Sequence, residues 1–316
     1  RKYVPETISE GWAAVFKTYP DPTVRFLPPD GAPAAWKEFQ DMVAEQAVCV
    51  FEAARTSYEV VVTETELGGI PVHDTRPPDW SDDGKVLLYI HGGAYVLGTS
   101  LTSIDAVAHV ATRTGLRVLS LDYSLAPHSK WQATTDEVVA VFADLLKAGF
   151  TMQDIAIFGD AAGGGLAAGS VLKMLDLGMG VPAAVVPWSP WADITETGDT
   201  YITLAVAEPA YTYEHTLGPA ALAYADPEDQ KHPYVSPVYG DFTKGFPPTL
   251  IQVGTRETFL SNAVRLYQAL DTAGMTVKLD VYEGMPHIFQ TLLPDSPEAR
   301  TAIGKMDAFL AEHLDR

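Results

Sequence analysis

The stretch IFGDAAGGGL at residues 157–166 reads as a strand that turns sharply through glycines into a helix. Turns of the form G-x-S-x-G carry the nucleophilic serine of many hydrolases. The frame of Gly159 and Gly163 is complete, but the central position holds Ala161. A helix that begins at Ala162 would point free backbone N–H groups and its positive dipole end at residue 161. Such a helix start suits an oxyanion or a phosphate, although the Gly-Lys-Ser/Thr of a P-loop is absent.

A second glycine turn, YIHGGAYVLGT at residues 89–99, directly follows a β-rich run. The backbone N–H groups of Gly92 and Gly93 can turn toward a tetrahedral intermediate, with the Ala162 N–H as a third donor. Removing one such donor typically costs about 10²–10³ in rate. Alone, the turn also fits a structural histidine beside two glycines. Its pairing with the 159–163 frame favours an oxyanion loop.

The segment YEGMPHIF at residues 282–289 places His287 just after the last predicted strand. A general base at that edge of the sheet would reach residue 161. A histidine base needs an acid that fixes its tautomer and stabilises its cation. The loop after the preceding strand, within TLIQVGTRETFLSNA at 249–263, holds one carboxylate, Glu257. We therefore predict His287 as the base and Glu257 as its acid, with a solvated carboxylate at a helix start as the alternative for Glu257.

These loops need a scaffold that brings them to one edge. From about residue 58, β-rich runs alternate with helical runs, and the runs that predict strands are 85–90, 117–123, 154–160, 183–189, 249–254 and 278–283. Before them, YEVVVTETEL and IPVHDTRP flank a Gly-Gly turn and predict an antiparallel pair. The alternation predicts an α/β fold with a mostly parallel, doubly wound sheet. Such sheets bind ligands at the carboxyl ends of their strands.

Two segments fall outside this alternation. Residues 1–55 are helical and polar, and residues 197–230 are helical and rich in alanine and tyrosine. We predict that both contribute to a helical cap over the carboxyl edge, which leaves 56–196 and 231–316 as the catalytic domain. Ordinary peripheral helices are the alternative. Candidate residues of a substrate pocket under this cap are Tyr95, Asp160, Trp188, Trp191, Tyr211, Tyr213 and Phe259.

Composition disfavours several classes of partner. The chain has 41 acidic and 21 basic residues, a formal net charge of −20 that repels nucleic-acid phosphates and anionic lipid headgroups. No run approaches the roughly 20 apolar residues of a membrane span, and RKYVPETISEGW has no signal-peptide core. The lone Cys49 fits a reducing compartment. We therefore expect a cytoplasmic protein without nucleic-acid partners. A leader removed before residue 1 would leave no trace, so export is the alternative.

With these residues assembled, the chain resembles the bacterial-type hormone-sensitive lipase family of α/β-hydrolases over roughly residues 58–316. Segments similar to that family's motifs occur in its order: HGGA (91–94), DYSLAP (122–127), GDAAGGGLA (159–167), SPWAD (189–193), YVSPVYGDFTKGFPPTLIQVG (234–254) and GMPHIF (284–289). The resemblance implies an eight-stranded sheet, a helical cap, and hydrolysis of carboxylic esters without metal or organic cofactor. It also implies a homodimer through an edge strand or helix.

The chain departs from the family pattern at a few positions. Ala161 replaces the serine, Ala94 replaces the fourth residue of HGGG, and Glu257 stands where an aspartate is usual. Ser124 and His128 replace the usual Arg and Glu around the LAP turn. A capped pocket on an acidic protein favours small to medium neutral esters, and lactones are the nearest alternative because their hydrolysis uses the same chemistry.

Ala161 leaves two hypotheses. Either the natural enzyme has serine here and the alanine was introduced, or the chain is a natural pseudoenzyme that binds a small molecule. A lineage released from catalysis would have no reason to keep an oxyanion loop, a base and an acid together. We therefore favour the introduced change and expect the chain with Ala161 to be almost inactive.

Overall fold

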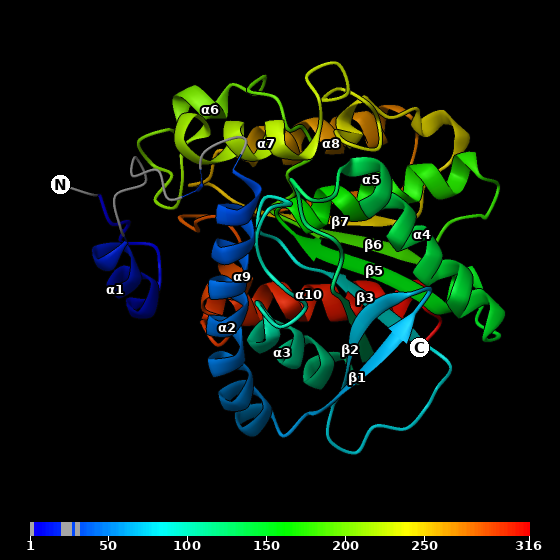
Figure 1. The fold of residues 1–316 in the computed structure, drawn as a ribbon. Helices are drawn as coiled ribbons and strands as arrows, with labels where there is room; N and C mark the ends of the chain where they lie inside the picture. Colours follow the sequence, from blue (N-terminus) through cyan, green and yellow to red (C-terminus); the bar gives the residue numbers. More distant parts are fainter. Residues whose placement is uncertain (1–2, 20–26, 29–31) are drawn as a thin grey trace.

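The computed structural model describes residues 3–19, 27–28 and 32–316 (Figure 1). Within helix α2, nothing is described of the side chains at 49 and 50, so the prediction for Cys49 lies outside the described residues. Parts of the predicted cap segment 1–55 also lie outside them. The two antiparallel strands at one edge and the parallel strands that follow form a single sheet of eight strands.

The order of strands across the sheet is β1-β2-β4-β3-β5-β6-β7-β8. β1 pairs with β2 and β2 pairs with β4 in antiparallel fashion, whereas the remaining neighbours are parallel. The bounds are β1 Val61–Leu67, β2 Ile70–Arg76, β3 Val86–Ile90, β4 Arg117–Leu121, β5 Ile155–Asp160, β6 Ala184–Trp188, β7 Thr249–Gly254 and β8 Val277–Tyr282. The predicted α/β-hydrolase fold with a mostly parallel sheet is confirmed.

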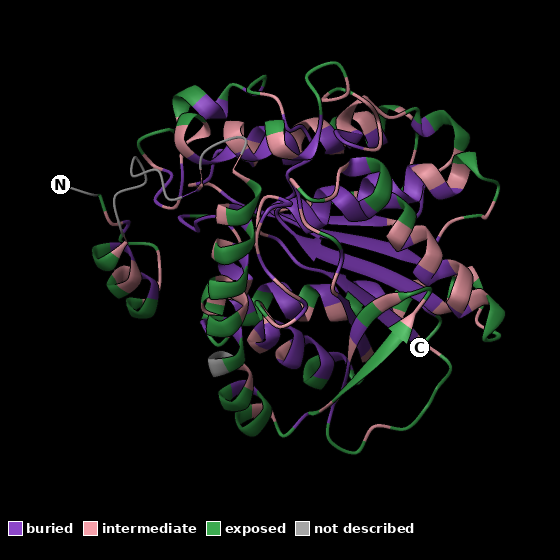
Figure 2. Cartoon of the chain, viewed as in Figure 1, coloured by how far each residue is buried: buried purple, intermediate pink, exposed green. Residues whose placement is uncertain are grey.

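Helices cover both faces of the sheet (Figure 1). α3 (Ile104–Thr114) and α10 (Pro297–His313) pack on one face, and α4 (Trp131–Lys147), α5 (Ala162–Asp176) and α8 (Leu260–Thr272) pack on the other. The central strands are therefore buried on both sides, as Figure 2 shows. This burial explains why β3 and β6, and β5 up to Phe158, read as continuous apolar runs rather than as alternating patterns.

The N-terminal helices lie at the side of this sandwich. α1 (Glu10–Thr18) packs its Trp12 and Phe16 against the loop after β8, and α2 (Pro33–Tyr58) lies along α3. α2 continues to Tyr58, so the predicted boundary at residue 55 falls inside a helix. The predicted helical insertion 197–230 forms short pieces: α6 (Thr200–Thr203), the π-helix η2 (Tyr213–Leu217) and α7 (Gly218–Tyr224). The remaining short helices are η1 (Met152–Asp154), η3 (Pro237–Tyr239), η4 (Phe242–Lys244) and α9 (Phe289–Leu292).

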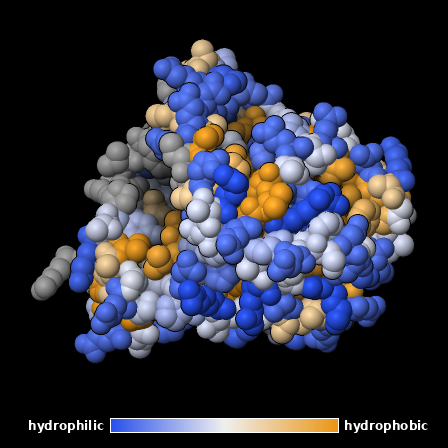
Figure 3. Space-filling model, turned by 90° about the horizontal axis from the view of Figure 1, so that it is seen from below, coloured by the Kyte–Doolittle hydropathy of each residue, from blue (hydrophilic) through white to orange (hydrophobic). Residues whose placement is uncertain are grey.

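Every helix in the described part of the chain is too short or too polar to cross a membrane. The face seen from below is mainly hydrophilic, with small groups of apolar side chains between the polar ones (Figure 3). The homodimer and the cytoplasmic location stay predictions.

The turn from β5 into α5 depends on the absence of side chains at its glycines. A Cβ on Gly163 would lie 2.0 Å from the carbonyl oxygen of Ile90, at the end of β3, and a Cβ on Gly159 would lie 2.6 Å from the backbone of Gly163. The first turn of α5 therefore rests directly on the backbone of the neighbouring strand. Only glycine permits this close approach.

The contact between Gly163 and Ile90 can be tested by stability measurements. Gly163→Ala should lower the free energy of unfolding by about 3 kcal/mol or more, because backbone rather than a flexible side chain must move. Gly304→Ala is the matched control, since a Cβ at this α10 position meets nothing closer than 3.7 Å. The control should gain about 0.5–1 kcal/mol. Equal stabilities of the two variants in urea unfolding would contradict the close approach.

Candidate active site

Ala161 occupies a strained position between β5 and α5. Its φ and ψ angles of 51° and −118° are unusual for a residue with a Cβ. Its N–H donates to the carbonyl of Trp188 (2.9 Å), and its carbonyl accepts from the N–H of Trp191 (2.8 Å). The backbone is thus fixed from both sides while the methyl group faces a cavity. Strain held by surrounding hydrogen bonds is typical of functional positions.

The cavity has a volume of about 240 Å³ and lies at the carboxyl edge of the sheet. Ala161, Ala162, His287 and the loop residues Gly93 and Ala94 form its polar end. The rest is mainly apolar and comes from the end of α1, the 197–230 insertion and the loops after β3, β6, β7 and β8, through Tyr19, Leu97, Trp191, Ala210, Tyr211, Thr216, Leu217, Phe259, Ile288 and Leu292. The structure therefore brings the sequence-predicted nucleophile position and base together.

His287 and Glu257 form a buried pair. Nδ1 of His287 lies 2.8 Å from Oε2 of Glu257, whose side chain is fully buried. The other oxygen of Glu257 accepts from the Ser189 hydroxyl (2.8 Å) and from the Gly254 N–H (2.7 Å). With Nδ1–H donating to the carboxylate, Nε2 is the acceptor, which is the tautomer that a general base requires.

Aromatic rings fix the orientation of the His287 imidazole. Tyr211 and Phe259 both meet it edge-on, with ring centroids 5.0 and 4.9 Å away and interplanar angles of 89° and 87°. Tyr211 comes from the 197–230 insertion, and Phe259 comes from the same loop as Glu257. The imidazole is therefore held by a hydrogen bond to Glu257 and by near-perpendicular contacts with the rings of Tyr211 and Phe259.

The oxyanion loop differs from the prediction at one residue. Gly92 was predicted as a donor, and this prediction is wrong because its N–H donates to Oδ1 of Asp160 (3.2 Å). Gly93 and Ala94 line the cavity instead, with φ angles of 107° and 55°. Among the described residues, no hydrogen-bond partner is found for the N–H groups of Gly93, Ala94 or Ala162. These three N–H groups are the candidate hydrogen-bond donors to an oxyanion. The resemblance of HGGA to HGGG could have indicated Ala94 as one of these donors.

Asp160 supports this loop rather than the substrate, contrary to the prediction. Its side chain is buried outside the cavity and accepts hydrogen bonds from the Tyr89 hydroxyl and the Gly92 N–H. Burial raises the pKa of Asp160. A Cβ on Gly92 would lie 2.3 Å from Oδ2 of Asp160, so the loop has no room to shift toward it.

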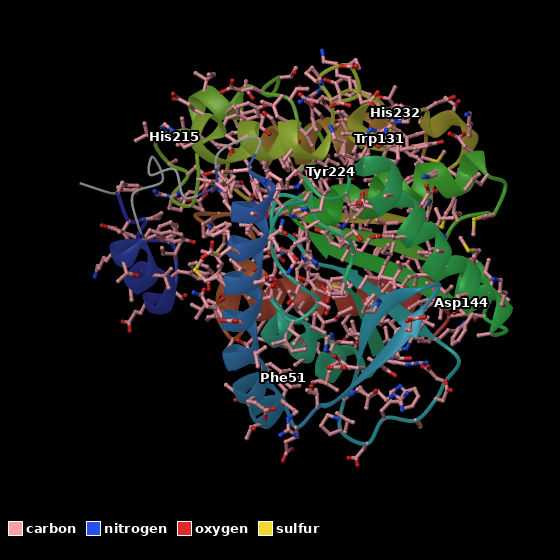
Figure 4. All side chains as sticks on the ribbon, in the orientation of Figure 1. Phe51, Trp131, Asp144, His215, Tyr224 and His232 are labelled. Carbon is pink, nitrogen blue, oxygen red and sulfur yellow. The ribbon has the colours of Figure 1, made fainter. Side chains whose placement is uncertain are left out.

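Three of the aromatic residues predicted for a substrate pocket lie at the cavity, and their contact with substrate stays a prediction. Trp191, Tyr211 and Phe259 line the cavity. Trp188 lies on the opposite face of the sheet against Phe158. Tyr95 stacks on Trp191 and on Tyr224, with a ring-centroid distance of 3.7 Å to Tyr224. Tyr224, which is labelled in Figure 4, belongs to α7. The Tyr213 hydroxyl donates to the Ile194 carbonyl. The prediction that these residues contact substrate is wrong for Trp188, Tyr95 and Tyr213, whose rings serve packing.

Glu208 in the 197–230 insertion was not predicted at all. Its side chain is buried, and its two oxygens accept from the N–H groups of Ala210 (2.9 Å) and Thr258 (3.2 Å). Burial raises the pKa of Glu208 to about 7, an effect that the nearby His287 opposes and Glu257 reinforces. The sequence around it, AVAEPAY, carries no motif that would have marked this carboxylate among the many others.

Among the described residues, no group of three His, Cys, Asp or Glu side chains is placed to hold a metal ion.

Comparisons with known proteins agree with this geometry. A family model described as the alpha/beta hydrolase fold matches residues 87–291. The chain is 36% identical over 228 residues to an acetyl-hydrolase of Streptomyces hygroscopicus, covering 72% of this chain and 76% of that protein. It is 30% identical over 231 residues to an esterase of Acinetobacter venetianus, covering 73% and 76%.

Solved structures give the same result. The crystal structure of an esterase E25 superimposes with a TM-score of 0.91 at 30% identity, over 99% of this chain and 97% of that one. An esterase from the bacterial hormone-sensitive lipase family gives 0.77 at 36% identity, over 81% and 85%. Fold and site define a carboxylesterase-type α/β hydrolase. Within this class, the chain belongs to the bacterial hormone-sensitive lipase family.

The Ser189 hydroxyl joins Glu257 to the loop that carries His287, because it donates to Glu257 and accepts from the Ile288 N–H (3.1 Å). Ser189→Ala leaves both groups without this partner in a buried site. The free energy of unfolding should fall by about 1–3 kcal/mol. Ser81→Ala, at an exposed serine, is the control and should stay within about 0.5 kcal/mol of the parent. Equal denaturant midpoints for the two variants would show that the hydroxyl contributes nothing.

Proposed function

We propose that the protein is a carboxylic ester hydrolase of the Ser-His-Glu type, in which Ala161 occupies the position of the nucleophilic serine. One observation carries this proposal. His287, which is hydrogen-bonded to the buried Glu257, lines the same cavity as Gly93, Ala94, Ala162 and the Ala161 methyl group. A hydroxyl at residue 161 would complete the nucleophile, base, acid and oxyanion site of an acyl-transfer enzyme.

The mechanism for the serine form follows from these positions. His287 Nε2 takes the proton of the serine hydroxyl, and the oxygen attacks the ester carbonyl. The N–H groups of Gly93, Ala94 and Ala162 bind the oxyanion of the tetrahedral intermediate. The imidazolium, stabilised by Glu257, then protonates the departing alcohol and leaves an acyl-serine. His287 next takes a proton from water, whose oxygen attacks the acyl group, and the proton returns to the serine as the acid leaves.

Alanine at residue 161 removes the hydroxyl and nothing else. We infer that the active protein has serine there, because the pair and the donors are arranged for a nucleophile that the chain lacks. With Ala161, the site retains only substrate binding and oxyanion stabilisation, and catalysis falls to the residual level that these supply.

The cavity supports small to medium neutral esters as substrates. Its volume of about 240 Å³ and its mainly apolar lining favour a short acyl chain without charge. The name of the Streptomyces relative, acetyl-hydrolase, points to the same size of acyl group. The formal charge of −20 disfavours anionic substrates. Lactones fit the same chemistry and are distinguished by assay.

Ala161→Ser should raise the hydrolysis of p-nitrophenyl acetate and butyrate by roughly 10³-fold or more over the Ala161 protein, because it restores the nucleophile. In the serine background, His287→Asn should abolish the gain, whereas His128→Asn, at an exposed histidine, should not. The assay is a chain-length series of p-nitrophenyl esters with a lactone series beside it. A serine form that binds these esters without cleaving them would identify a binding protein instead.

Leu217 tests the size limit of the cavity. It is buried and lines the apolar end, so Leu217→Ala should enlarge the cavity and move the preferred acyl chain of the serine form to greater length. Stability should fall by about 2–5 kcal/mol. Leu222→Ala, at a half-exposed position of α7, is the control and should leave the chain-length profile unchanged. An unchanged profile for both variants would place the acyl group elsewhere.

A further inference from the structure

Thr258, the residue after the catalytic acid, is held at both of its backbone polar groups by the 197–230 insertion. Its N–H donates to Oε2 of Glu208 (3.2 Å), and its carbonyl accepts from the Thr200 hydroxyl (2.6 Å). The other oxygen of Glu208 accepts from the Ala210 N–H (2.9 Å). One buried carboxylate therefore connects the backbone beside Glu257 with the backbone beside Tyr211.

Both connected segments act on His287. Glu257 bonds to its Nδ1, and the rings of Phe259 and Tyr211 meet it edge-on. If Thr258 or Ala210 moved, at least one of these contacts would open. The position of the base thus depends on a residue that touches neither the imidazole nor the cavity.

We propose that Glu208 is a positioning residue, which joins the insertion to the acid loop and thereby sets the orientation and the electrostatic environment of His287. This inference rests on the proposed esterase function for its catalytic part. It extends that function to a residue outside the predicted triad, and it makes the insertion part of the catalytic machinery instead of a passive cover.

Several titratable groups interact with Glu208. His287, Glu257 and the Arg256 guanidinium interact electrostatically with Glu208 from the loops after β8 and β7. The hydroxyls of Tyr19, at the end of α1, and of Tyr211, in the insertion, also interact with it. The positive charge of a protonated His287 favours ionised Glu208, and the interaction is reciprocal. Ionised Glu208 therefore stabilises the imidazolium that forms when the serine proton is transferred. Glu208 loses this negative charge as the pH falls below about 7, because burial has raised its pKa to about 7.

The kinetic test uses the Ala161→Ser protein. Glu208→Gln keeps the size of the side chain and removes its charge. We expect kcat to fall by roughly 10-fold with KM changed less than about 2-fold, because the interaction strengthens only as the imidazolium forms. The acidic limb of the kcat/KM profile should also move to lower pH, since the protonated base is less favoured without the second carboxylate.

Two further variants separate charge from position. Thr200→Val removes the other hydrogen bond to Thr258 without a change of charge, so it should lower kcat while leaving the acidic limb in place. Glu214→Gln is the matched control, with the same charge change at an exposed glutamate of the same insertion. It should alter neither quantity. Glu208→Asp should restore the position of the acidic limb and only part of kcat, because its carboxylate is one methylene short.

A second arm needs no activity and uses the Ala161 protein. The pKa of Glu208 is raised from its ordinary 4.5 to about 7, so the protonated form stabilises the fold at low pH and this stability is lost as pH rises through 7. Between about pH 5 and about pH 8, the parent Tm should drop a few degrees more than that of Glu208→Gln.

The outcomes of the two arms are distinct. An inactive serine form together with the expected Tm difference would reject the esterase function but not the burial of the Glu208 carboxyl group between the insertion and the acid loop. Glu208→Gln that matches Glu214→Gln in kcat, acidic limb and Tm would overturn the proposal. If Glu208→Gln does not fold, Glu208→Asp and Thr200→Val decide, because a positioning role requires both to lower kcat.

Discussion

The close approach of Gly163 to the carbonyl of Ile90 is the constraint on which the site depends. It seats the first turn of α5 on the end of β3, so the free N–H of Ala162 and the oxyanion loop that follows β3 meet at one point. Gly165 extends this contact, since a Cβ there would lie 2.3 Å from the carbonyl of Trp191 after β6. Backbone touches backbone on both sides of the helix start. These backbone contacts fix the position of residue 161 more rigidly than contacts through side chains could.

His287 and Glu257, the proposed base and acid, are positioned by a second set of contacts across the ends of β6, β7 and β8. Ser189, Glu257 and His287 each follow one of these strands, and hydrogen bonds join them in a row. A fully buried carboxylate is costly unless donors satisfy it. Glu257 meets this requirement with the hydroxyl of Ser189, the N–H of Gly254 and the imidazole. The same bonds that stabilise its charge fix the tautomer of His287. In this way the stability of the fold and the chemistry of the site rest on the same atoms.

The features that could be predicted from the sequence are those that local residue patterns and the order of the strands determine. Gly159 and Gly163 indicated the turn, and the place of His287 and Glu257 after successive strands indicated a shared edge. Other features depend on packing between distant segments. Which N–H of the HGGA turn faces the cavity is decided by the bond from Gly92 to Asp160, so Gly92 could not be separated from Ala94 by spacing alone. Trp188 points to the opposite face because of strand pleat and register. Glu208 had no local signal, since its function in the fold arises from Thr258, far away in the chain.

The central claim is that the cavity binds an ester with its carbonyl carbon at residue 161. The Ala161 protein allows this to be observed directly, because an ester should remain uncleaved in it. A crystal of this protein soaked with p-nitrophenyl butyrate should place the carbonyl oxygen within about 3 Å of the N–H groups of Gly93, Ala94 and Ala162. The carbonyl carbon should lie over the Ala161 methyl group, with His287 Nε2 facing the ester oxygen. An ester bound with its carbonyl away from these donors, or an empty cavity at saturating ester, would contradict the account.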